Sequence, residues 1–197
     1  MKSIYDDVEL QISEEVYKPA EDTFFLADNL EVVEGEDVLE LGTGSGLLSI
    51  LTARQGGTVV ATDINEEALV CARQNAVLNG FEDRIEFRLG DLFDPIEDEK
   101  FDLIIFNPPY LPVPEDEPRW SALERAWDGG PDGRKVIDRF LEEAKDYLKP
   151  GGRLMFVQSS LTGFGETLKK LNECFEVEVK REKLSFESLF LFMSRLD

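Results

Sequence analysis

The segment Asn107-Pro108-Pro109-Tyr110 has the side chains and backbone best suited to chemistry in this chain. The Asn107 amide oxygen and the Pro108 carbonyl are both hydrogen-bond acceptors, and two acceptors held close together suit a substrate NH2 group. The Tyr110 ring can stack on a planar group. A turn with a surface tyrosine is the simpler alternative. We expect Asn107, Pro108 and Tyr110 to be catalytic, and Asn107, Pro109 and Tyr110 to bind the substrate.

A buried strand must position this segment. Residues Phe101 to Phe106 form a short apolar run with β-branched residues in its middle, which is typical of such a strand. The two prolines prevent the sheet ladder from continuing, and a residue before proline prefers an extended backbone. Asn107 is therefore expected at the carboxyl end of a strand, where open α/β sheets bind their ligands.

A glycine loop lies upstream, between a predicted strand and a predicted helix. The strand Asp37 to Leu41 is followed by Gly42-Thr43-Gly44-Ser45-Gly46 and then by an apolar helical run. Glycines let a ligand approach backbone N–H groups closely. The G-x-G-x-G spacing differs from the G-x-G-x-x-G of dinucleotide sites, and the Glu40 carboxylate suits a cationic amino group or hydroxyls. We expect Glu40, Gly42 and Gly44 to bind a cofactor.

Two more acidic residues follow predicted strands. Asp63 ends the strand Thr58 to Thr62, about 20 positions after the loop, and is placed to accept both hydroxyls of a ribose. Asp91 follows the alternating strand Arg84 to Leu89 and is placed for an adenine amino group, with Leu92 or Phe93 against the ring. Taken alone, Asp63 would indicate a solvated strand end and Asp91 a turn.

A cationic cofactor fits this row of strand ends. In parallel strands, Glu40, Asp63, Asp91 and Asn107 would line one edge of the sheet. S-adenosylmethionine carries positive charge at sulfur and at nitrogen, so carboxylates favour it where they would repel NAD. The sequence therefore predicts an S-adenosylmethionine site whose methyl group faces Asn107.

Composition limits the alternatives. The chain has 197 residues, which we interpret as one domain, and its net charge of −21 argues against a stand-alone nucleic-acid binder. It lacks histidine, which excludes histidine bases, and its two cysteines lie too far apart in sequence for a metal motif, so we expect no metal. We also expect no membrane segment and a cytoplasmic location, because no long apolar run or signal-peptide pattern occurs.

The other segments complete the expected elements. Residues 111–133 are rich in Pro, Gly and Glu and carry Trp120 and Trp127; we interpret them as a substrate-facing lid, with a structural tryptophan pair as the alternative. A small strand pair or loop is expected within residues 1–19. The remaining expected elements are a helix from Ala20, a helix over Arg134–Leu148 and strands over Arg153–Gln158, Phe175–Val179 and Leu189–Met193.

The order of these motifs resembles that of the class I S-adenosylmethionine-dependent methyltransferases. Within them the chain is similar to the HemK-like enzymes that methylate the glutamine of class I release factors, and specifically to the archaeal and eukaryotic type. The resemblance covers nearly the whole chain and rests on Tyr17-Lys18-Pro19-Ala20-Glu21-Asp22-Thr23, Glu40 to Gly46, Asn107-Pro108-Pro109-Tyr110-Leu111-Pro112, Trp127-Asp128-Gly129-Gly130 and Asp132-Gly133-Arg134.

This resemblance implies a fold and a partner. The fold is a Rossmann-like α/β domain with a seven-stranded, mostly parallel sheet, an antiparallel last strand and helices on both faces. Thr23 becomes a cofactor contact. A small zinc-binding activator subunit is implied as well, and we place it at the expected edge strand with Ile85, Phe87 and Leu89.

Three alternatives remain open, two of them enzymatic and one non-catalytic. A nucleic-acid amino-methyltransferase would use the same segment with Tyr110 stacked on a flipped base, although the acidic charge counts against it. A protein lysine methyltransferase is a narrower alternative. A non-catalytic protein built on this fold is disfavoured because the cofactor row is intact.

Overall fold

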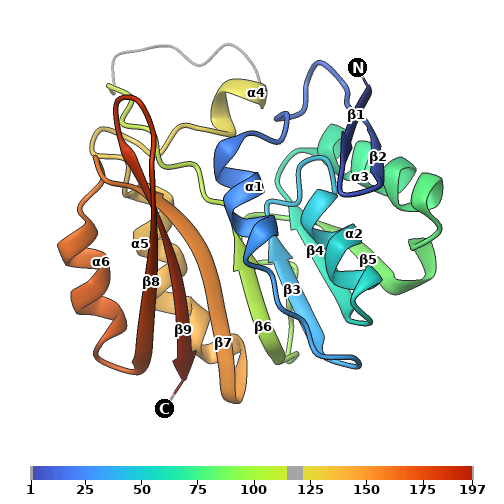
Figure 1. Cartoon of the computed structure of the whole chain (residues 1–197). Coiled ribbons are helices and arrows are strands. Elements are labelled where there is room, and N and C mark those ends of the chain that lie inside the picture. Colours follow the sequence, from blue (N-terminus) through green and yellow to red (C-terminus); the bar gives the residue numbers. More distant parts are fainter. Residues whose placement is uncertain (1, 115–121, 197) are drawn as a thin grey trace. The chain divides into compact units, whose positions relative to one another are not determined.

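The structure of the chain is a computed structural model that describes residues 2–114 and 122–196. Two compact units, Met1–Glu99 and Lys100–Asp197, make up the chain, and each is described by itself (Figure 1). The single domain expected from the length stays a prediction.

The first unit contains three parallel strands in the order β5-β4-β3. Their register pairs Leu41 with Thr62 and Asp63 with Leu89, so the carboxyl ends of all three strands meet at one edge. These strands match the predicted ones closely. The elements that carry the site are β3 (Asp37–Leu41), β4 (Thr58–Asp63), β5 (Ile85–Leu89), α1 (Glu21–Asp28), α2 (Leu47–Arg54), α3 (Glu66–Asn79) and the 3-10 turn η1 (Glu82–Arg84).

A short hairpin precedes these elements and packs on α3. Strands β1 (Lys2–Tyr5) and β2 (Val8–Gln11) are antiparallel, as the predicted strand pair allowed. Asn79 and Asn75 of α3 accept hydrogen bonds from the backbone N–H groups of Glu9 and Gln11, at 3.0 and 2.8 Å. Figure 1 shows this hairpin beside α3.

The second unit contains four strands in the order β6-β7-β9-β8. Strand β6 is parallel to β7, whereas β9, the last strand of the chain, is antiparallel to both β7 and β8. The structure therefore confirms the predicted Rossmann-like α/β class with seven mostly parallel strands and a reversed last strand. The bounds are β6 (Phe101–Phe106), α4 (Ala122–Arg125), α5 (Lys135–Glu143), η2 (Ala144–Tyr147), β7 (Leu148–Ser159), α6 (Phe164–Leu171), β8 (Phe175–Lys183) and β9 (Ser188–Leu196).

Aromatic rings form the centre of the second unit. Phe140 of α5 lies between Phe106 of β6 and Phe156 of β7, with ring centroids 5.1 and 5.3 Å away, and Phe156 stacks on Phe192 of β9 at 4.9 Å. All four side chains are buried. Burial of this much apolar surface fixes α5 against the strands, and α5 begins directly after the segment that supports Tyr110.

The predicted bounds of four elements are wrong in the second unit. The helix expected over Arg134–Leu148 ends at Glu143 and continues as a 3-10 turn, and strand β7 begins at Leu148 rather than Arg153. Here β6 and β7 pair irregularly between Phe101 and Leu103, which lets the Pro-Gly segment stay extended. Strands β8 and β9 are also longer than predicted. Strand β8 is an edge strand whose charged residues face solvent while its backbone still pairs with β9.

Candidate active site

Three acidic residues of the first unit lie at one edge of the sheet. Glu40 is near the end of β3, Asp63 ends β4, and Asp91 follows β5 by two residues. The Gly90 N–H donates to the Asp63 carbonyl at 3.0 Å, which ties the segment before Asp91 to the end of β4. The structure thus brings the predicted acidic row of this unit together.

Glu40 is a buried carboxylate that joins β3 to the glycine loop and to α2. It accepts hydrogen bonds from the Thr43 hydroxyl at 2.9 Å and from the Ser49 hydroxyl. Burial raises its pKa to about 7; the two hydroxyls oppose this shift and the charge of Asp63 adds to it. Glu40 therefore changes charge near neutral pH, unlike an exposed glutamate.

Asp63 is held by backbone N–H groups on both of its oxygens. Gly44 donates to Oδ2 and Asn65 donates to Oδ1, each at 2.9 Å. Burial raises the pKa of Asp63, and these N–H groups lower it in part. Each carboxylate oxygen has a second lone pair, so Asp63 can still accept hydroxyl donors from a ligand.

The glycine loop is shaped by packing on one side and by open space on the other. Gly46, directly before α2, has a φ of 82°, and a side chain there would lie 3.0 Å from Ala72 Cβ and 3.1 Å from its Cα. A side chain at Gly44 would meet no atom within 4 Å. Gly42, with a φ of 64°, is exposed. The loop is therefore rigid where it meets α3 and accessible to a ligand at Gly42 and Gly44.

The segment after β5 differs in part from the expectation for an adenine site. Asp91 is half-buried, as a ligand-facing residue can be. Leu92 has a positive φ of 48° and is buried, and the Thr62 hydroxyl lies 3.5 Å from its carbonyl oxygen. Phe93 is 1% exposed and Leu92 7%, so Leu92 is the more accessible of the two candidates for the ring contact.

Thr23 lies in the first turn of α1 and is buried together with its neighbour. Asp22 accepts from the Thr23 backbone N–H at 2.6 Å and from its hydroxyl at 3.2 Å. The Tyr17 hydroxyl donates to the same carboxylate at 3.2 Å, which raises the Tyr17 pKa in addition to its burial. Sequence reasoning singled out Thr23 but not Asp22, although both belong to the quoted Tyr17–Thr23 segment.

These groups fit S-adenosylmethionine by the chemistry of their donors and acceptors. Glu40, Asp63 and Asp91 offer negative charge for a cation and acceptors for hydroxyl and amino groups, and the loop backbone is accessible at Gly42, whereas the Gly44 N–H donates to Asp63. When bound, the cofactor supplies an electrophilic methyl group on its sulfonium. No group of three His, Cys, Asp or Glu residues in the described part of the chain could hold a metal ion.

In the second unit, Asn107 directly follows β6. Its side chain is half-buried, as are Pro109 and Tyr110, whereas Pro108 is buried. By extension of the β6–β7 register beyond Phe106 and Phe156, Pro108 comes level with Gln158 of β7. The structure therefore places the four residues at the carboxyl end of a buried strand, as predicted.

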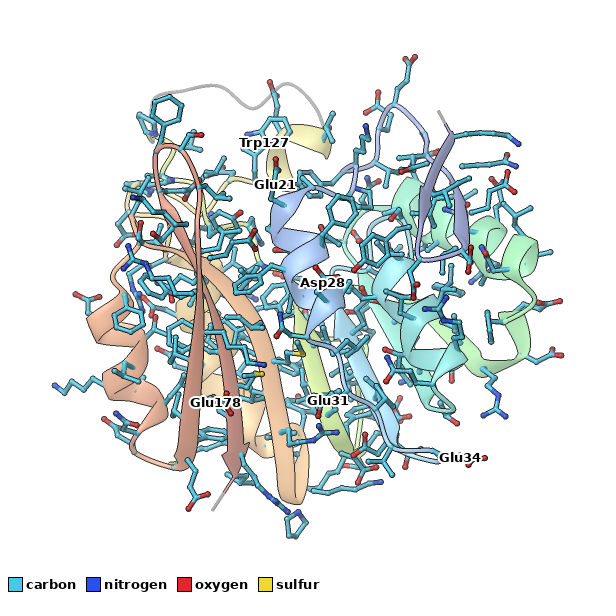
Figure 2. All side chains as sticks on the ribbon, viewed as in Figure 1. Glu21, Asp28, Glu31, Glu34, Trp127 and Glu178 are labelled. Carbon is cyan, nitrogen blue, oxygen red and sulfur yellow. The ribbon has the colours of Figure 1, made fainter. Side chains whose placement is uncertain are left out.

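The segment after Tyr110 pairs with the segment around Trp127. The Leu111 N–H donates to the Trp127 carbonyl and the Gly129 N–H donates to the Leu111 carbonyl, both at 2.9 Å. The Val113 N–H adds a bond to the Gly130 carbonyl at 2.8 Å. Trp127, half-buried after α4, is labelled in Figure 2. Trp120 lies outside the described residues, so the predicted lid and the predicted tryptophan pair both stay predictions.

Gly133 packs against the backbone of Tyr110, and Arg134 ties the same region to the segment after β7. A side chain at Gly133 would lie 2.3 Å from the Tyr110 carbonyl oxygen and 2.3 Å from Thr162 Cγ2, so only glycine fits. The Arg134 guanidinium is buried, donates to the carbonyls of Thr162 and Gly163 at 2.7 and 3.0 Å, and forms an ion pair with Asp138 at 2.7 Å. This network holds the Tyr110 backbone against α5 and the end of β7.

Two buried amides were not predicted as site residues. Asn75 of α3, fully buried, donates to the Ser45 carbonyl of the glycine loop at 2.9 Å. Gln158 of β7, also fully buried, donates to the Thr162 carbonyl, which Arg134 shares. Asn75 acts on a residue 30 positions away, and only the spacing of Asn75 and Asn79 on one helix face gave a local signal for it; Gln158 bonds to a residue four positions on, but no sequence pattern marked it.

The chain is similar in sequence to known methyltransferases. The family described as "Methyltransferase domain" matches residues 33–188. The chain is 47% identical over 189 residues to "Putative protein N5-glutamine methyltransferase" of Methanocaldococcus jannaschii, covering 94% of each chain. It is 39% identical over 166 residues to "Methyltransferase HEMK2" of Homo sapiens, covering 79% of this chain and 77% of the relative.

A relative of lower identity and a solved structure agree with this family and this fold. The chain is 33% identical to a "Release factor glutamine methyltransferase" of Gloeobacter violaceus, over 84% of this chain and 61% of that one. A crystal structure of ribosomal protein L11 methylase from Lactobacillus delbrueckii superposes with a TM-score of 0.68 at 22% identity, covering 92% of this chain and 82% of the other, which shows the shared fold.

No helix in the described ranges is long and apolar enough to cross a bilayer. The motifs, the strand order within each unit and the similarity to these relatives agree with one another. The chain belongs to the class I methyltransferase family, in its HemK-like branch.

Proposed function

We propose that this protein transfers a methyl group from S-adenosylmethionine to the side-chain amide of a protein glutamine, and that the acceptor is the Gly-Gly-Gln motif of a class I translation release factor. The similarity to relatives named for glutamine methylation supports the acceptor. The observation that carries the proposal is the position of Asn107 and Pro108 at the carboxyl end of β6. Since translation takes place in the cytoplasm, the same acceptor supports a cytoplasmic location.

The first unit would hold the cofactor. Asp63 accepts the ribose hydroxyls, Asp91 the adenine amino group, with Leu92 against the ring. Glu40 and the backbone at Gly42 bind the amino-acid part, the open space at Gly44 lets the ligand approach, and Thr23 adds a hydroxyl. Support comes from the shared edge of Glu40, Asp63 and Asp91 and from the space in front of Gly44.

Asn107 and Pro108 would activate the acceptor by position. An amide nitrogen is a weak nucleophile because its lone pair is delocalised, and the chain has no histidine to deprotonate it. The Asn107 Oδ1 and the Pro108 carbonyl accept hydrogen bonds from the two N–H groups of the acceptor amide. These bonds orient the nitrogen lone pair and stabilise the positive charge that develops on nitrogen. Pro109 and Tyr110 pack against the rest of the acceptor side chain.

Substitution of Asn107 tests this role. We expect Asn107→Ala to lower turnover on a Gly-Gly-Gln peptide by on the order of 100-fold or more. Cofactor affinity should stay within about threefold, because Asn107 meets the acceptor rather than the bulk of the cofactor. Turnover is measured by methyl incorporation with labelled S-adenosylmethionine, and affinity by calorimetry.

Asn172→Ala is the matched control, because Asn172 is exposed at the end of α6 in the same unit. Near-normal turnover of Asn107→Ala would remove the proposed role. The same assay offers a peptide with Lys in place of Gln, bulk tRNA and DNA as acceptors. Label in nucleic acid but not in the glutamine peptide would favour the nucleic-acid alternative, and label in the lysine peptide the lysine alternative.

We further propose that a partner subunit covers the edge strand β5. Of the three predicted contacts, Leu89 is 55% exposed, Phe87 lies half-buried under the Arg73 guanidinium, and Ile85 is buried. Val70 and Val77, one helical turn on either side of Arg73, are exposed as well. These apolar side chains support an interaction surface over β5 and α3; that the partner is a small zinc-binding activator rests on the resemblance.

A further inference from the structure

The turn between β8 and β9 presents a large apolar side chain entirely to solvent. Phe186 is 100% exposed, more than any other large hydrophobic residue in the described chain. Leu161, in the segment after β7, is 61% exposed. The two segments adjoin, because the Ser160 N–H donates to the Ser188 carbonyl at 2.8 Å.

This turn is held in place by several hydrogen bonds. The Ser188 N–H donates to the Ser160 hydroxyl at 3.0 Å, and the Ser159 hydroxyl donates to Glu187. Across the turn, the Leu184 N–H donates to the Glu187 carbonyl at 2.9 Å. The backbone that carries Phe186 is therefore fixed, so binding there would cost less conformational entropy than binding to an unsupported loop.

Phe186 lies at the same edge of the second unit as Asn107. Strand β9 is antiparallel to β7, so its beginning, next to Phe186, is level with the carboxyl end of β7, and β6 is parallel to β7. Figure 1 shows the β8–β9 turn and the carboxyl ends of β6 and β7 pointing the same way. With strands about 4.8 Å apart, β9 lies about 10 Å and β8 about 14 Å from β6.

A protein acceptor would reach this turn. A standard protein–protein interface buries about 800 Å² on each partner, which as a disc has a radius of about 16 Å. The β8–β9 turn also projects beyond Ser188, toward the side from which an acceptor approaches Asn107, so an acceptor of this size would contact it, whereas a peptide of a few residues would not. Exposed, rigidly mounted aromatic residues are typical binding hot spots.

We propose that Phe186 and Leu161 form a docking surface for the folded acceptor protein, where an apolar patch beside its target glutamine loop binds. This inference rests on the proposed glutamine methylation and adds how the acceptor protein is selected. The surface raises affinity for the whole acceptor without touching the reacting atoms.

The test compares two acceptors for the same variants. For Phe186→Ala and for Phe186→Ala with Leu161→Ala, we expect the KM for an intact class I release factor to rise about tenfold or more with kcat unchanged. The KM for a short Gly-Gly-Gln peptide should stay within about twofold. Phe186→Leu should raise the KM for the release factor much less than Phe186→Ala does, because it keeps an apolar side chain. Val33→Ala, at a residue 67% exposed in the first unit, should change neither acceptor's kinetics.

Three results would overturn the inference. An unchanged KM for the release factor would show that the surface does not bind it. An equal loss on the peptide and on the release factor would show that Phe186 acts on the chemistry or on the fold. If the unsubstituted enzyme methylates neither acceptor, with or without a candidate activator subunit, the proposed function itself fails and the docking surface with it, and this result is distinct from the first two.

Discussion

At the scale of single residues, Glu40 has the most unusual environment in the first unit. Its carboxylate is 2% exposed and faces a second carboxylate, Asp63, and the hydroxyls of Thr43 and Ser49, with the Ser49 backbone N–H, compensate it in part. Such a site stabilises the neutral acid at pH 6, and a cation bound nearby would stabilise the ionised carboxylate. The fold therefore retains a costly charge that a cationic ligand can stabilise.

Glu40 should make stability depend on pH. Its folded pKa of about 7 lies above the reference value of 4.5, so between these values the folded state binds more protons than the unfolded state, and stability falls as pH rises. The stabilisation is fully present below pH 4.5 and is lost by about pH 7. We compare the free energies of unfolding of the natural chain and of Glu40→Gln. Their difference, natural chain minus variant, should fall by on the order of 3 kcal/mol between pH 4.5 and about pH 7.

Urea unfolding of both proteins at pH 5, 6, 7 and 8 measures this difference, in which the other titrating groups largely cancel. Glu34→Gln, on an exposed glutamate before β3, is the control. A flat difference for Glu40→Gln would mean that Glu40 titrates like a surface residue.

The sequence predicted which residues occupy the site edges but not what holds them. Glu40, Asp63 and Asn107 stand at strand ends that apolar runs mark, so local patterns located them. Their partners come from elsewhere in the chain: the Gly44 N–H on Asp63 is 19 residues away, and Thr162 under Arg134 is 28 residues away. Local sequence carries no signal for such contacts, which depend on how the elements pack.

At the scale of elements, α3 is the link between the N-terminal hairpin and the glycine loop. Asn75 accepts from the Gln11 N–H at 2.8 Å and donates to the carbonyls of Gln11 and Ser45 at 3.2 and 2.9 Å. One buried amide thus completes backbone hydrogen bonds of both segments. Helix α3 performs this role in addition to its packing against β4 and β5.

Loss of the Asn75 amide should destabilise the protein. Asn75→Ala removes the hydrogen bonds of the Gln11 N–H and the Ser45 carbonyl, while the Gln11 carbonyl keeps the Cys71 thiol, so we expect the free energy of unfolding to fall by about 2 to 3 kcal/mol. Asn79→Ala, which removes contacts to Glu9 but none to the loop, should cost about 1 kcal/mol. Chemical denaturation measures both.

Cofactor affinity separates the two variants further. After correction for the unfolded fraction, Asn75→Ala should weaken S-adenosylmethionine binding severalfold, because the Ser45 carbonyl loses its partner, and Asn79→Ala should not. Equal affinities would show that Asn75 supports the hairpin alone.

Element boundaries were predictable where an apolar run ends sharply and not where backbone pairing sets the length of a strand. Strands β3 and β6 match the predicted residues because apolar runs end sharply at charged or Pro-rich turns. Strand β8 extends through Lys180 to Lys183, which the sequence predicted as a break. Backbone pairing with β9 decides its length, and that pairing leaves no trace in hydropathy.

At the scale of the whole molecule, the net charge of −21 governs which partners can approach. A phosphate backbone would meet repulsion across the surface, which supports a protein acceptor over a nucleic acid. The same charge keeps two copies of the chain apart at low ionic strength. Exposed apolar side chains at the β5 edge, chiefly Leu89, can therefore persist without self-association until salt screens the repulsion.

The isolated chain should consequently associate with itself at high salt. Screening shortens the Debye length from about 14 Å at 0.05 M to about 3 Å at 1 M, so only at the higher concentration should the apolar surface over β5 and α3 drive association. Sedimentation velocity should show a monomer at 0.05 M and larger species at 1 M. Leu89→Lys should reduce these species because a charge on an edge strand opposes pairing, whereas Val33→Lys, away from β5, should not. A chain that stays monodisperse at both concentrations and is fully active alone would contradict the partner subunit, since its edge would then need no cover.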